Sequence, residues 1–134
     1  MDRFLSFYRI LYIKAKADLS AAQILYTKFN EGDTELDIEV ICFHLQQCAE
    51  KLLKAVLSKK EIYYPKVHDL ETLLNITKEH NILINTDWDL LIELNDYAVE
   101  GRYAVMHDDL QNIQSVFIII EKLMEDISAV IDLK

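Results

Sequence analysis

The sequence has 134 residues, of which 51% are hydrophobic and 28% are charged, so it is long enough for one domain with its own core and too short for two. Its formal net charge of −9 weighs against tight, general binding to nucleic acid, because affinity for a polyphosphate comes largely from cationic side chains. With two glycines and one proline there is little turn-forming sequence, and we therefore expect residues 1–134 to form a single all-helical domain.

The first predicted helix runs from about Asp2 to Asn30, where apolar residues recur every three or four positions. Charged residues interrupt this segment and it has no small-residue cleavage site, so we expect neither a signal peptide nor a membrane span. Gly32 is expected to end the helix in a left-handed conformation, and Asp33 or Thr34 can cap the next helix.

The second predicted helix, from about Leu36 to Lys59, has the most regular apolar period in the sequence. Its apolar residues step by three and four and predict one seam facing a helical bundle: Ile38, Ile41, Leu45, Cys48, Leu52 and Ala55. Cys42 and Cys48 are the only cysteines, which suits a reduced cytoplasmic protein whose thiols act as small core side chains. A disulfide between them is not expected, because six helical residues turn their side chains to different faces.

The next segments are shorter. A loop is predicted around Pro65, because proline pushes the residue before it out of helical geometry. A helix from about Asp69 to His80 follows, and then a polar link over residues 81–86. Thr86 or Asp87 can cap a fourth helix that continues through roughly residue 103.

The fifth predicted helix, from about Asp108 to Leu133, contains the apolar run "VFIII" at residues 116–120. A helix that is apolar on all sides in a small soluble bundle needs two burial surfaces, one in its own core and one against a partner. The run therefore predicts a homodimer.

Four stretches of the sequence, in this order, resemble the HEPN domain (higher eukaryotes and prokaryotes nucleotide-binding domain). They are "KAKADLSAAQILY", "FHLQQCAEKLLKAVL", "KVHDLETLL" and "LNDYAVEGRYAV". The resemblance implies an all-α, up-and-down bundle of four to five helices that often forms homodimers. It also implies the small prokaryotic type that is paired with a minimal nucleotidyltransferase, often as toxin and antitoxin.

Catalytic members of this family are metal-independent ribonucleases that use an Arg followed, after four to six residues, by a His. Arg102 and His107 satisfy that spacing at the junction of the last two helices. By this resemblance His107 is the acid/base, because imidazole titrates near neutral pH, and Arg102 holds the phosphate with its planar guanidinium. Single-stranded RNA or a nucleotide is the expected ligand.

Two alternatives remain open for these residues. Arg102 can instead pair with an acid on a neighbouring helix, and His107 can cap the last helix. In that case the protein is a catalytically silent module, which binds a nucleotide or serves as the interaction subunit of a nucleotidyltransferase. The polar side of the second helix carries a stripe of His44, Gln47, Lys51 and Lys54, which either lines a groove for nucleotide or RNA phosphate or is a solvated face.

Neither a metal nor a cofactor is predicted. His44 and Cys48 are four residues apart, a spacing that can supply two metal ligands, but Cys48 belongs to the apolar seam and two further ligands are missing. The sequence also has no glycine-rich phosphate loop.

Overall fold

The structure is a computed structural model that describes residues 6–32, 37–97 and 110–131. Within these ranges the chain is helical with no β-strand, which confirms the all-α prediction. The elements in chain order are α1 (Phe7–Asn30), α2 (Ile38–Lys59), α3 (Leu70–Glu79), α4 (Trp88–Ile92), the 3₁₀ helix η1 (Glu93–Tyr97) and α5 (Leu110–Ile131). No helix in the described ranges combines the length and the apolar character needed to cross a lipid bilayer.

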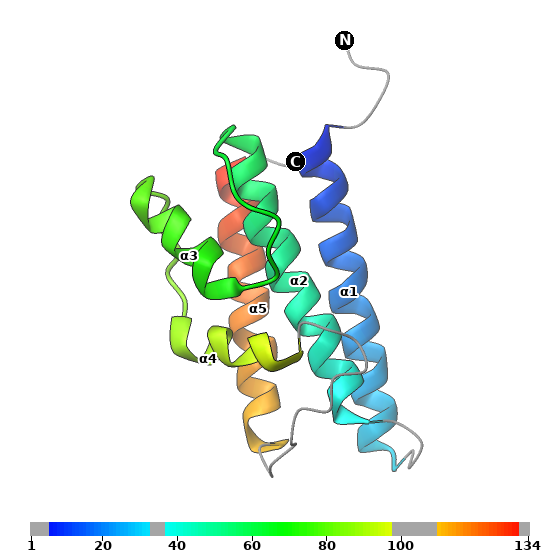
Figure 1. Cartoon of the computed structure of the whole chain (residues 1–134). Helices are drawn as coiled ribbons and strands as arrows, with labels where there is room; N and C mark the ends of the chain where they lie inside the picture. Colours follow the sequence, from blue (N-terminus) through cyan, green and yellow to red (C-terminus); the bar gives the residue numbers. More distant parts are fainter. Residues whose placement is uncertain (1–5, 33–36, 98–109, 132–134) are drawn as a thin grey trace.

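Three long helices form the bundle, and α2 is its centre. The chain descends along α1 and returns along α2, and the short helices α3 and α4 then bring it back so that α5 runs in the same direction as α2 (Figure 1). Helix α2 contacts α1, α3, η1 and α5. Each part of the bundle is therefore positioned with respect to this one helix.

The apolar seam predicted for α2 is confirmed. All six of its residues are buried, and five of them are fully inaccessible to solvent. Burial extends beyond the seam to further residues on the flanks of α2, namely Ala49, Leu53, Val56 and Leu57, because several elements cover the helix. Burying this much aliphatic surface is the main favourable contribution to the stability of the bundle.

The observed helix ends follow local capping chemistry. Gly32 adopts φ +92° and its N–H donates to the carbonyl of Phe29, so the predicted left-handed end of α1 is confirmed. Helix α2 begins after Asp37, and the alternative caps Asp33 and Thr34 lie outside the described residues. At the start of α1, Ser6 is extended, so the helix begins later than the predicted Asp2.

The prediction of one continuous fourth helix is wrong over residues 93–97. Asp87 caps α4, accepting a hydrogen bond from the N–H of Leu90 at 3.1 Å, but the α-helix ends at Ile92 and tightens into η1. Within η1 the side chain of Asn95 accepts from the N–H of Leu70 at 2.8 Å and donates to Asp69 at 2.7 Å. These tertiary contacts to the start of α3 favour the tighter turn. The last part of the prediction, residues 98–103, lies outside the described residues.

Asp69 is the predicted and observed N-cap of α3. Its carboxylate accepts from the N–H of Glu71 at 3.1 Å and from the hydroxyl of Thr72 at 2.7 Å. The hydrogen bond from Thr72 is the largest influence that lowers the pKa of Asp69 below its ordinary value. The stabilisation from this carboxylate is therefore present above the ordinary Asp pKa and is lost as the pH falls through the lowered pKa.

We expect Asp69→Ala to lower the free energy of unfolding by about 1 kcal/mol at pH 7, because the first turn of α3 loses its side-chain acceptor. The measurement is urea unfolding followed by circular dichroism. The difference between the two proteins should shrink as the pH falls through the lowered pKa of Asp69, where the carboxylate of the parent becomes protonated. Asp89→Ala, an exposed position in α4, is the control. Equal effects of the two substitutions would contradict the capping role.

Candidate functional site

The predicted catalytic pair, Arg102 and His107, lies outside the described residues, and its assignment stays a prediction. The described elements on either side are η1, which ends at Tyr97, and α5, which begins at Leu110. Both of these elements pack against α2.

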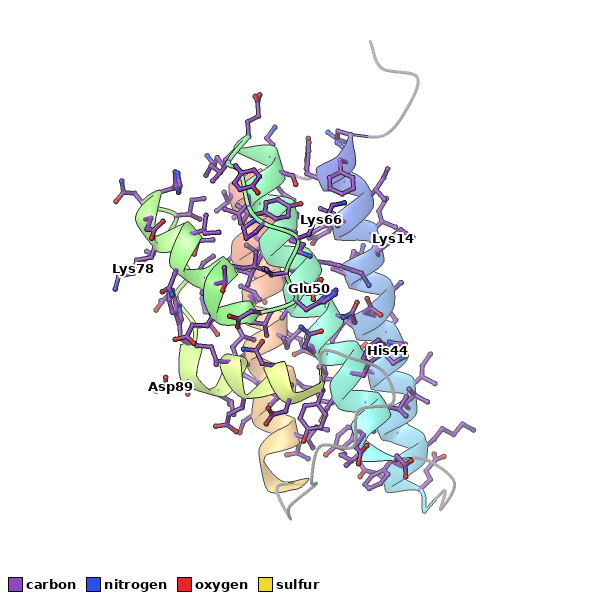
Figure 2. All side chains as sticks on the ribbon, viewed as in Figure 1. Lys14, His44, Glu50, Lys66, Lys78 and Asp89 are labelled. Carbon is purple, nitrogen blue, oxygen red and sulfur yellow. The ribbon has the colours of Figure 1, made fainter. Side chains whose placement is uncertain are left out.

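Two residues of the predicted polar stripe of α2, His44 and Lys51, contact α1, and His44 is labelled in Figure 2. Asp18 of α1 joins two of the four stripe residues: one carboxylate oxygen is 2.9 Å from Nδ1 of His44, and the other accepts a hydrogen bond from the ammonium of Lys51. The Asp18 side chain is 13% exposed, and those of His44 and Lys51 are 27% and 23% exposed. The structure therefore brings His44 and Lys51 together around one carboxylate.

A second polar cluster surrounds Glu50, which follows His44 by six positions on α2. Its buried carboxylate accepts from the ammonium of Lys54 at 2.9 Å and from the side-chain amide of Gln46 at 3.2 Å. Nδ1 of His68, in the loop before α3, lies 3.0 and 3.2 Å from the two carboxylate oxygens. Gln46 also donates to the carbonyl of His68 at 2.9 Å, so the loop is held to α2 at two points.

Gln47, the remaining residue of the stripe, donates its side-chain amide to Gln46 at 2.7 Å. All four stripe residues thus have partners within the protein, and none is fully exposed. Each lysine of the stripe faces a carboxylate, which offsets part of its positive charge. Its proposed contact with nucleotide or RNA phosphate stays a prediction.

Sequence patterns did not reveal the two carboxylates that organise these clusters. Asp18 belongs to α1 and is 26 positions from His44, so no local spacing links them. Gln46 and Glu50 are buried although both are polar. Glu50 is two positions from Cys48 and from Leu52, on the side of α2 away from the apolar seam, so helical spacing gave no signal of its burial. Its burial accompanies the contacts of His68, in the loop before α3, with Glu50 and Gln46.

The cysteines are free and belong to the core, as predicted. Burial raises the pKa of the Cys42 thiol to about 12 and raises that of Cys48 as well, so both stay protonated at neutral pH. Cys48 is fully buried on the apolar seam, as a core side chain would be. In the part of the chain that the structure describes, no group of three or more metal-binding side chains is present.

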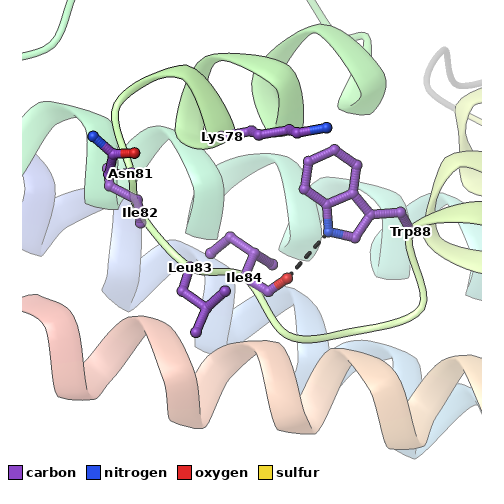
Figure 3. A pocket seen from close by; sticks show the side chains of 6 residues that line it. All are labelled: Lys78, Asn81, Ile82, Leu83, Ile84 and Trp88. Atoms are coloured by element: carbon purple, nitrogen blue, oxygen red, sulfur yellow. Dashed lines mark hydrogen bonds between the residues drawn. The ribbon is translucent and has the colours of Figure 1, made fainter.

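A separate pocket of about 500 Å³ lies where the link after α3 turns toward α4 (Figure 3). The indole N–H of Trp88 donates to the carbonyl of Ile84 at 3.1 Å and fixes one wall. Trp88 is partly buried and packs against the core. The residues that line the pocket are Lys78, Asn81, Ile82, Leu83, Ile84 and Trp88, and none of them belongs to a predicted site.

The apolar run of α5 is mostly satisfied within one chain. Val116, Phe117 and Ile120 are buried and Ile119 is partly buried, whereas Ile118 is 65% exposed. Ile118 borders a groove of about 390 Å³ between α1 and α5, which Tyr26 and Phe117 also line. The part of the apolar run that is exposed and available for the predicted homodimer contact is thus smaller than the sequence indicated, and Ile118 is its most exposed residue.

The family model described as HEPN domain matches residues 8–130, from the second residue of α1 to the last but one residue of α5. No curated protein and no solved structure matches the chain.

Proposed function

Because this chain belongs to the HEPN domain family, we propose that it is a metal-independent endoribonuclease whose catalytic pair is Arg102 and His107. The observation that supports this proposal is the spacing of the two residues within the matched region 8–130. Arg102 is followed by four residues and then His107, in the interval between η1 and α5, the two elements that flank this part of the sequence and pack on α2.

The proposed reaction needs only these two kinds of side chain. A ribose 2′-oxygen attacks the adjacent phosphorus, and the bond from phosphorus to the 5′-oxygen of the next nucleotide breaks. An imidazole of His107 takes the 2′-hydroxyl proton, and a protonated imidazole supplies one to the leaving 5′-oxygen. The guanidinium of Arg102 stabilises the charge on the phosphoryl oxygens. The products are a 2′,3′-cyclic phosphate and a free 5′-hydroxyl.

We propose that two copies of the chain form the active assembly, so that both imidazoles act in one cleft. Ile118 is the exposed apolar residue of α5 that supports this proposal. Light scattering should give about twice the 15.7 kDa of a single chain, and Ile118→Lys should give the mass of one chain because it places a charge in the interface. Leu83→Lys, at another exposed aliphatic residue, should leave the dimer intact. A wild-type monomer at micromolar concentration would contradict the assembly.

The cellular role that fits this activity is one half of a two-component system in the cytoplasm. The proposed partner is a minimal nucleotidyltransferase, with this chain as the toxin and the transferase as the antitoxin. The family resemblance supports this pairing, and a transferase gene beside the gene for this chain would support it further.

A second candidate function has its own supporting observation. Lys51 and Lys54 both face carboxylates, so the polar stripe is arranged as a largely neutral surface. Such a surface suits a catalytically silent module that binds a nucleotide or acts as the interaction subunit of a nucleotidyltransferase. The two candidates differ in one measurable respect, the cleavage of RNA.

The test is incubation of the purified protein with single-stranded RNA of varied sequence in the presence of a metal chelator. The ribonuclease proposal expects cleavage with 2′,3′-cyclic phosphate ends. Intact RNA, with the dimer confirmed in the same sample, removes this proposal and leaves the silent module.

A further inference from the structure

The His44 ring is held in a defined orientation by Asp18. Nδ1 of His44 lies 2.9 Å from a carboxylate oxygen, and an ionised carboxylate only accepts hydrogen bonds. Nδ1 therefore carries the hydrogen, and in the neutral ring Nε2 carries the lone pair. Within residues 6–32, 37–97 and 110–131, Nε2 has no hydrogen-bond partner, and the His44 side chain is 27% exposed. The neutral ring thus presents an acceptor at this position.

Lys51 presents the complementary group beside it. Its ammonium contacts the other oxygen of the same Asp18 carboxylate, so the imidazole and the ammonium flank one small group. An ammonium has three N–H donors, and one hydrogen bond to Asp18 leaves others for a ligand. The pair offers one acceptor and one cationic donor, side by side.

This pattern does not match phosphate alone. The oxygens of a phosphodiester only accept hydrogen bonds, so they pair with Lys51 but not with the lone pair of His44. A ribose 2′-hydroxyl can donate to that lone pair, and in RNA the 2′-hydroxyl is adjacent to the 3′-phosphate of the same sugar. DNA lacks the hydroxyl and leaves the acceptor unmatched.

We propose that His44 and Lys51 form a ribose-phosphate recognition site that selects RNA over DNA, with Asp18 as the positioning residue. His44 accepts the hydrogen bond of one 2′-hydroxyl, and Lys51 donates to the neighbouring phosphate. The site recognises a sugar of the bound strand, which need not be the sugar at which cleavage occurs. The inference rests on the proposed function because it takes RNA as the ligand, and it changes the predicted role of His44 from phosphate to ribose recognition.

The other oriented histidine, His68, is less suited to this role. Glu50 orients its ring in the same way, but His68 directly precedes Asp69. The hydroxyl of Thr72 lowers the pKa of Asp69, whose carboxylate is therefore ionised and repels a phosphodiester. His68 therefore provides a matched control: Glu50 and Lys54 accompany it as Asp18 and Lys51 accompany His44, but Asp69 adds a second carboxylate beside the ring.

The test measures binding of three labelled oligonucleotides of one sequence: RNA, its 2′-O-methyl form, which keeps the oxygen but has no donor, and DNA. A His107→Ala background keeps the RNA intact. This parent should bind RNA roughly two- to tenfold more tightly than either analogue, the effect of one neutral hydrogen bond. Adding His44→Ala should remove the preference, Lys51→Ala should weaken all three ligands, and His68→Ala should change neither property.

The orientation of the ring has its own readout. Two-bond proton–nitrogen correlation spectra should show Nε2 of His44 as the lone-pair nitrogen in the parent and a mixture of tautomers in Asp18→Asn, whose amide can donate as well as accept. Circular dichroism of each variant confirms that it is folded. A single unchanged tautomer in Asp18→Asn would exclude the positioning role.

The outcomes separate this inference from the proposed function. No RNA cleavage by the wild type, together with an RNA preference that depends on His44, removes the ribonuclease and leaves the recognition site. RNA cleavage by the wild type, together with a preference for RNA over DNA that persists in His44→Ala, keeps the ribonuclease and removes the recognition site. A parent that binds no RNA, or that binds all three oligonucleotides equally, overturns the recognition site.

Discussion

His107→Ala is expected to lower the rate of RNA cleavage by roughly 10²- to 10⁴-fold, the usual contribution of a positioned acid/base group. The reason is that alanine can neither take the 2′-hydroxyl proton nor supply one to the leaving oxygen. The measurement is single-turnover cleavage of a labelled single-stranded RNA by wild type and variant. Arg102→Ala should cause a comparable loss, and Arg102→Lys should recover little, because an ammonium cannot hold two phosphate oxygens in a planar fork.

The matched control is His80→Ala. His80 is an exposed histidine at the C-terminal end of α3, and its Nδ1 lies 3.0 Å from the carbonyl of Ile76. Its replacement should leave the cleavage rate within about twofold of wild type, because His80 is not one of the proposed catalytic residues and a substitution at an exposed position has little effect on folding. If His107→Ala retains the wild-type rate, the cleavage belongs to another residue or to a contaminant, and the silent module becomes the better account.

Leu52→Ala is expected to lower the free energy of unfolding by about 2–5 kcal/mol, because it leaves a cavity in a close-packed core. Leu52 is fully buried on α2, the helix that contacts α1, α3, η1 and α5. A loss of this size is a large part of the total stability of a small domain, roughly 5–15 kcal/mol. Chemical unfolding followed by circular dichroism gives the value, with the RNA cleavage rate of the folded fraction measured in parallel.

Leu83→Ala removes the same atoms from a different environment. Leu83 lies on the link after α3 and is 80% exposed. Its replacement should change the free energy of unfolding by less than about 0.5 kcal/mol. Similar losses at the two positions would show that α2 is not the centre of the core.

The sequence predicted the helical fold because its apolar residues follow a simple period. The seam of α2 is regular over six residues, and each of them is buried. Local chemistry also located several helix ends, as with Gly32 after α1 and Asp69 before α3, because a cap acts on its immediate neighbours.

The parts that the sequence did not predict depend on contacts between distant residues. The 3₁₀ turn of η1 accompanies hydrogen bonds from Asn95 to the start of α3, 25 and 26 positions away. The candidate site was likewise predicted only in part. Helical spacing identified the stripe residues of α2. The positions of Asp18 and of His68 beside them depend on how α1 and the loop before α3 pack on α2. The assignment of Arg102 and His107 as the catalytic pair is based on the family resemblance and on their spacing.

The Asp18 carboxylate also fixes how far α1 can slide along α2. On the buried face of α1 the small side chains of Ala15 and Ala22 alternate with the larger ones of Leu11 and Leu19, so a shift of one helical turn, about 5.4 Å, would exchange small for large residues in the contact. Such a shift would also separate Asp18 from both His44 and Lys51 and leave a largely buried charge without its partners, at a cost of several kcal/mol. The shared carboxylate thus adds an electrostatic cost to every alignment of these two helices but one.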